Sequence, residues 1–120
     1  MVSQPLTPFL FHDADMVVVN KPSGLLVHRG WGRDDVTLIE HLKAALPDQR
    51  IHTVHRLDRG TSGAVLIALN PETARDLSEQ LAAQSIAKSY LALVRGRLTE
   101  PIEVNHPLAP EKGAPRVEAT

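Results

Sequence analysis

The stretch that decides the fold is GAVLIALNPETARDL, at residues 63–77. Ala64 to Leu69 form a continuous apolar run, which is the pattern of a strand buried on both faces. Asn70 and Pro71 then match the residues preferred at the N-cap and at the first position of a helix. Apolar residues recur at helical spacing as far as about Gln84. This stretch therefore predicts a buried strand followed directly by an amphipathic helix.

Strands and helices also alternate on either side of this stretch. Short β-branched or alternating runs predict further strands at residues 16–19, 25–27 and 88–94, and residues 51–58 are expected to form a strand that runs into a loop. A second helix is expected to begin at a cap formed by Thr37 or Asp35 and to end before Pro47. Many of the connections are short, so we predict an α+β fold with a mixed, largely antiparallel sheet and flanking helices.

Length and composition limit the class of protein. The chain has 120 residues, of which 42% are hydrophobic, and this fits a single globular domain. The absence of Cys excludes a disulfide scaffold and a Cys nucleophile. No run approaches the ~18 apolar residues of a membrane span, and no secretory signal is visible, so we expect a cytoplasmic protein. A net charge of −1 argues against indiscriminate binding to phosphate.

The densest polar cluster is HTVHRLDRGTSG, at residues 52–63. It lies between two apolar runs, where a loop would hold reactive groups on a rigid base. Asp58 stands between Arg56 and Arg59, and neighbouring cations favour the ionised carboxylate that a nucleophile or base requires. The alternative is a surface turn in which Asp58 pairs with an arginine, and composition alone favours that alternative.

Other kinds of site find little support in the sequence. His52 and His55 lie in a segment that reads as extended, so they should point to opposite faces, and no carboxylate completes a metal site. Ser62 lies in GTSGA, one residue short of the nucleophile elbow G-x-S-x-G. Tyr90 is either a core ring whose hydroxyl reaches water or a platform on which a base stacks.

Three segments in order carry a resemblance to a known family. They are NKPSG at residues 20–24 followed by Val27-His28, HRLDRGTSG at 55–63, and KSY at 88–90 before VRG at 94–96. Together they resemble the RluA-type family of RNA pseudouridine synthases over about residues 10–110. The sequence HRLDxxTSG matches that family at every fixed position. His28 to Trp31 are similar to the branch that acts on a tRNA uridine.

The resemblance implies a reaction and roles for three side chains. A uridine in structured tRNA or rRNA would be isomerised after its base is flipped out of the stack. Asp58 would be the essential aspartate, which attacks the ribose or abstracts a sugar proton. Tyr90 would pack on the uracil, and Arg56 would enter the RNA stack in the space that the flipped nucleotide leaves.

Further expectations concern the RNA backbone and cofactors. Lys21 and Arg29 lie in a basic region that is either a phosphate contact or a solvated loop, and together with Arg59 they are expected to contact the RNA backbone. Neither a metal nor an organic cofactor is implied, and the protein is expected to be a monomer. Because binding to RNA needs basic residues on one face only, a near-neutral total charge is compatible with it.

One departure from the family concerns length. The family's catalytic domain is considerably longer, and its later motif supplies a basic residue that pairs with the aspartate. No candidate for that residue follows Arg97 in a comparable context. Residues 1–120 are therefore expected to be the N-terminal portion of a single pseudouridine synthase catalytic domain. The alternatives are a catalytically incomplete RNA-binding fragment and, more remotely, a carboxylate-dependent hydrolase.

Overall fold

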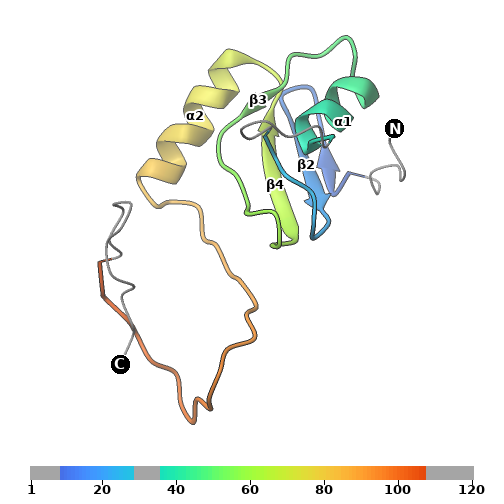
Figure 1. Cartoon of the computed structure of the whole chain (residues 1–120). Coiled ribbons are helices and arrows are strands. Elements are labelled where there is room, and N and C mark those ends of the chain that lie inside the picture. The colour runs from blue at the N-terminus through green and yellow to red at the C-terminus, as the bar shows by residue number, and fades with distance from the viewer. Residues whose placement is uncertain (1–8, 29–35, 108–120) are drawn as a thin grey trace. The chain divides into compact units, whose positions relative to one another are not determined.

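The computed structural model describes residues 9–28 and 36–107. It divides the chain into two compact units, Met1–Lys88 and Ser89–Thr120. All helices and strands of the described residues lie in the first unit (Figure 1): β1 (Phe11–His12), β2 (Met16–Lys21), α1 (Leu38–Ala45), β3 (His52–Thr53), β4 (Gly63–Ala68) and α2 (Pro71–Ala82). No helix of the described residues is long and apolar enough to cross a membrane.

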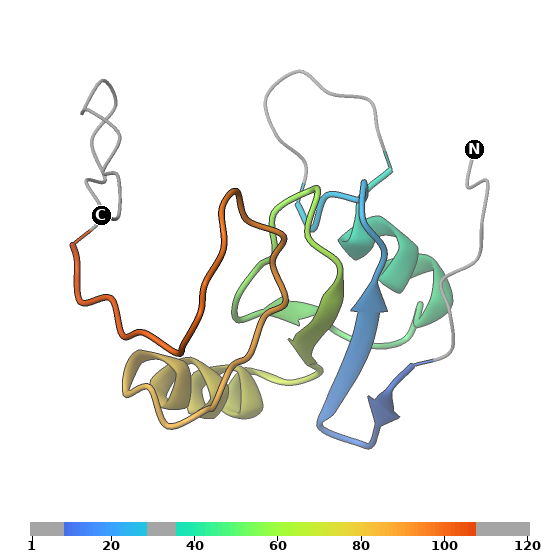
Figure 2. The same cartoon turned by 90° about the horizontal axis from the view of Figure 1, so that it is seen from below.

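The four strands form one sheet in the order β1-β2-β4-β3. Every neighbouring pair is antiparallel, and β2 pairs with β4 from Met16 opposite Ala68 to Lys21 opposite Gly63. The two helices lie on different sides of β4 (Figure 2), and α2 contacts both β4 and β3. The predicted α+β class with a largely antiparallel sheet is therefore confirmed.

The core lies between α1 and one face of the β2–β4 pair. Val17 faces Ile67 across the ladder, and Val19 faces Val65, so the four side chains share one face of the sheet. All four are buried, and they form one cluster with Leu38 and Leu42 of α1. Burial of a side chain of this size contributes roughly 1.5–3 kcal/mol. The hydrophobic face of α1 is thereby fixed against β2 and β4.

The decisive stretch forms the expected strand and helix. Its central strand is β4, and Asn70 is the N-cap of α2 because its side-chain oxygen accepts the Thr73 N–H at 2.8 Å. The prediction of burial on both faces was wrong, since Ala64 is exposed and Leu66 is only half-buried. One face of β4 is covered completely, as is usual in antiparallel sheets.

The helix predicted at Thr37 is α1, but the short strand predicted at 25–27 is absent. Thr37 caps the helix through a reciprocal pair of hydrogen bonds with Glu40. Two further N–H groups of the first turn donate to the carbonyls of Leu26 and Val27. The carbonyls of Leu26 and Val27 therefore accept hydrogen bonds from free N–H groups at the start of α1 instead of pairing with a strand.

Two further predictions concern residues 51–58 and 88–94. Residues 51–58 form the expected strand that runs into a loop, since His52 and Thr53 are paired with β4 and the chain then leaves the sheet. Residues 88–94 are not a strand, and the second unit contains none in its described part. Leu91 and Leu93 are fully exposed there. Apolar alternation alone does not make a strand, because backbone N–H and C=O groups need a paired neighbour.

Candidate active site

The loop at residues 54–62 connects β3 to β4 and carries Asp58. The Thr61 N–H donates to the Asp58 carbonyl at 3.0 Å, which closes a tight turn. Leu57 is buried in the core, whereas the Asp58 side chain is exposed. Gly63 begins β4 with a φ of +137°, a conformation that other residues adopt only under strain. The chain thus anchors the residue before Asp58 and presents the carboxylate to solvent.

A second loop, which follows β2, holds this turn from the other side. The Gly24 N–H donates to the Arg59 carbonyl at 2.6 Å. The Ser23 hydroxyl donates to the Gly60 carbonyl at 2.8 Å. Gly24 has a φ of +95°, which turns its N–H towards the neighbouring loop without the strain that a side chain would cause.

The Lys21 side chain hydrogen-bonds to both loops from the interior of the protein. Its side chain is completely buried at the end of β2, and its Nζ donates to the carbonyls of Pro22 at 3.0 Å, Leu25 at 2.6 Å and Arg59 at 3.1 Å. Burial lowers the pKa of Lys21, and the negative charge of Asp58 opposes that shift. The segments NKPSG and HRLDRGTSG are therefore two halves of one hydrogen-bonded unit.

The start of the Asp58 loop has two side-chain anchors. The Leu66 N–H of β4 donates to His55 Nε2 at 2.9 Å. The Thr53 hydroxyl and His28 Nε2 also form a hydrogen bond of 2.9 Å, which ties β3 to the segment after the NKPSG loop. Neither anchor was predicted from the sequence, because nothing in a local pattern shows which distant backbone group a histidine reaches.

The structure brings together part of the predicted set of site residues. Asp58 and Arg56 are exposed on the same loop, and Arg59 is half-buried beside them. Arg29 lies outside the described residues. Tyr90 belongs to the second unit, where its side chain is 63% exposed and available to a ligand.

Lys21 differs from the surface cation that the sequence led us to expect. All three protons of its ammonium group have carbonyl partners, and the side chain is inaccessible to solvent. In this conformation its charge stabilises the protein's own loops. Direct contact of Lys21 with an RNA phosphate stays a prediction, and the structure gives the residue a different role.

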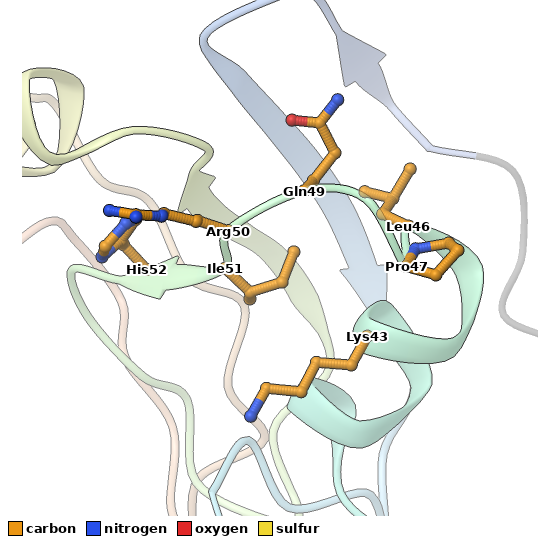
Figure 3. Close-up of a pocket in the computed structure, with 7 residues that line it drawn as sticks. All are labelled: Lys43, Leu46, Pro47, Gln49, Arg50, Ile51 and His52. Atoms are coloured by element: carbon orange, nitrogen blue, oxygen red, sulfur yellow. The ribbon is translucent and has the colours of Figure 1, made fainter.

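A separate depression of about 450 Å³ lies where α1 ends and β3 begins (Figure 3). Lys43 and Arg50 supply two cations to its lining, and the buried Nε2 of His52 has no hydrogen-bond partner among the described residues. His52 pairs with Ala68, whereas the Asp58 loop joins β4 at its other end. The depression is therefore distinct from the Asp58 loop. No group of three His, Asp or Glu in residues 9–28 and 36–107 is arranged to hold a metal ion.

Comparison with known proteins gives one consistent result. Residues 15–119 match the family model described as RNA pseudouridylate synthase. The tRNA pseudouridine synthase C of Haemophilus ducreyi is 44% identical over 101 residues, which are 82% of this chain and 41% of the relative. The ribosomal large subunit pseudouridine synthase C of Haemophilus influenzae is 47% identical over 96 residues, which are 79% of this chain and 30% of the relative.

A solved structure points to the same family as the sequence relatives. The human protein RNA Pseudouridylate Synthase Domain Containing 1 superposes with a TM-score of 0.62 at 33% identity, over 77% of this chain and 34% of the human chain. Across these relatives the chain spans between 30% and 41% of their length.

Proposed function

This chain belongs to the RNA pseudouridylate synthase family, and we propose that it isomerises uridine to pseudouridine within a structured tRNA or rRNA. In this reaction the N1–C1′ bond of the nucleotide breaks, the uracil turns, and C5 bonds to C1′. C5 loses a proton and N1 gains one, so the product is an isomer of the substrate. The observation that carries the proposal is the exposed carboxylate of Asp58 on a turn that is hydrogen-bonded to the end of β2 and to the loop that follows it.

Asp58 is proposed as the catalytic residue, either as a nucleophile at the ribose or as the base that removes a sugar proton. Both roles require an ionised carboxylate held in one position while it faces the substrate. The Thr61 N–H and the bonds to the Arg59 carbonyl fix the backbone around it. The buried ammonium of Lys21 interacts electrostatically with the Asp58 carboxylate, and this attraction opposes the lowering of the Lys21 pKa by burial.

The remaining roles concern the RNA. Arg56 is exposed two residues before Asp58, and we propose that its side chain fills the space left by the flipped uridine. Tyr90 would pack on the uracil while it rotates, a role for which its exposed ring is free. Arg59 and Arg29 would contact phosphates of the RNA backbone.

The test is formation of pseudouridine in a tRNA or rRNA transcript, measured by nucleoside chromatography. We expect Asp58→Ala to lower the rate by at least about a thousandfold. The control is Asp76→Ala, which removes another exposed carboxylate, from α2, and should leave the rate unchanged. Equal loss in both variants would contradict a specific role for Asp58.

The alternative is a catalytically incomplete RNA-binding fragment. The observation that favours it is the chain's coverage of 30% to 41% of its relatives. This alternative predicts that the wild type and Asp58→Ala bind the same transcript equally and that neither forms pseudouridine. Binding measured by filter retention, beside the modification assay, separates the two functions.

A further inference from the structure

The ladder between β3 and β4 ends after two pairs, the last being Thr53 with Ile67. In the same register the next residue of β4, Leu66, would bind a backbone carbonyl of an extended β3. Its N–H instead donates to His55 Nε2 at 2.9 Å. The imidazole nitrogen therefore takes the place of a strand carbonyl, and the backbone of the following residues is free to leave the sheet.

This bond fixes one side of the Asp58 loop. His55 holds the chain to β4 three residues before Asp58, and Leu57 is buried between them. On the other side, Gly24 and Lys21 both donate to the Arg59 carbonyl, one residue after Asp58. The carboxylate thus lies between two fixed points, and loss of either gives the turn more freedom.

We propose that His55, as a neutral imidazole, is the positioning residue for Asp58: its Nε2 holds the start of the loop on β4, and its protonation releases the loop. The catalytic consequence of this inference rests on the proposed function. The structural part stands on the Leu66 contact alone and is tested independently.

The surroundings of His55 favour the neutral form that the contact requires. An acceptor nitrogen must be unprotonated, because a doubly protonated imidazole has only donors. Burial lowers the pKa of His55, and the positive charge of Lys88 lowers it further. β4 is GAVLIA and presents no charged side chain to the ring. The contact is therefore intact at neutral pH and is lost on acidification.

The structural test uses the ¹⁵N-labelled chain and NMR spectra between about pH 8 and about pH 5, the range in which histidine titrates. We expect the Leu66 amide and the amides of residues 58–61 to shift with one midpoint, that of the His55 ring. Lys88→Gln removes the neighbouring charge and should raise this midpoint. Loop amides that do not follow the His55 titration would overturn the proposal.

Two substitutions of His55 separate the effect of its hydrogen bond to Leu66 from the effect of its side-chain volume. The amide oxygen of His55→Gln can accept the Leu66 N–H and does not titrate, so the loop should keep its neutral-pH spectrum throughout. His55→Leu fills similar space without an acceptor, so the loop amides should be shifted at every pH. A Gln variant that resembles the Leu variant contradicts the proposal. If the Leu variant fails to fold, the wild-type titration and the Gln variant decide whether His55 positions the loop.

The catalytic test compares kcat and KM for pseudouridine formation at neutral pH. We expect His55→Leu to lower kcat at least about tenfold with KM unchanged, and His55→Gln to recover most of the loss. An unchanged kcat in the Leu variant would overturn the catalytic part. If the wild type itself forms no pseudouridine, the proposed function has failed, and the NMR titration alone decides the role of His55.

Discussion

Lys21 places a charged group on the face of β2 that otherwise carries Val17 and Val19. The ammonium is tolerated because three carbonyls surround it, and two of them belong to residues at the loop that follows β2. The third, from Arg59, belongs to the Asp58 loop. One side chain thereby couples the end of β2 to the turn that presents Asp58.

Lys21→Met should lower the free energy of unfolding by about 1–3 kcal/mol, because the carbonyls of Pro22 and Leu25 lose this donor while that of Arg59 keeps the Gly24 N–H. The measurement is urea denaturation followed by circular dichroism. Lys43→Met removes an exposed lysine from α1 and should change stability by less than about 0.5 kcal/mol. A Lys21→Met variant as stable as this control would show that the three hydrogen bonds contribute nothing.

His55 predicts a pH dependence of stability. Its pKa in the folded chain is lowered by burial and by Lys88, so below the usual histidine value of about 6.5 the unfolded chain takes up a proton first. Stability should therefore fall as the pH drops below about 6.5, and the loss should stop below the folded-state pKa. Above about 6.5 both states are neutral at this residue and the effect vanishes.

The measurement is the free energy of unfolding of the wild type and of His55→Gln at several pH values. The other five histidines are common to both proteins, so the difference between the two curves isolates His55. A difference that is constant with pH would contradict the lowered pKa.

At the scale of elements, α1 depends on its first turn. Thr37 is buried, and its hydroxyl accepts the Glu40 N–H while the Glu40 carboxylate accepts the Thr37 N–H. Thr37→Ala should lower stability by about 1 kcal/mol, whereas Thr37→Ser keeps the hydroxyl and should cost less. Thermal or urea unfolding measures the difference. Equal losses in both variants would assign the effect to the missing methyl group instead of the cap.

The elements show which parts of the fold can be predicted from sequence. β2, β4, α1 and α2 were predicted because β-branched runs, helical periodicity and caps are local signals. The strands predicted at 25–27 and 88–94 were wrong because strands require a pairing partner, which is a non-local property.

The candidate site also has a part that could be predicted from sequence and a part that could not. The position of Asp58 in a loop between two strands was predicted from its neighbours in sequence. The contacts that hold the loop were not, because the Lys21–Arg59 bond joins residues 38 positions apart and the His55–Leu66 bond joins a side chain to a strand backbone. Sequence motifs mark such contacts without showing which atoms make them.

At the scale of the whole molecule, the two units contribute unequally to stability. Every core residue lies between Val17 and Leu69, and every described residue of 89–107 is exposed. Several of these exposed residues are large and apolar, including Leu91, Leu93 and Leu98. Since hydrophobic stabilisation follows the apolar area removed from water, the described part of the second unit adds little to the free energy of folding.

A fragment of residues 1–88 should therefore unfold cooperatively, with a free energy within about 0.5 kcal/mol of that of the full chain. It keeps Lys88, so the charge that acts on His55 is retained. It should also self-associate less in analytical ultracentrifugation, because it lacks the exposed leucines at 91, 93 and 98. A fragment that loses cooperative unfolding would show that the second unit supports the core.

Under the proposed function this fragment folds yet forms no pseudouridine, since it carries Asp58 without Tyr90. Folding and catalysis would then depend on different parts of the chain.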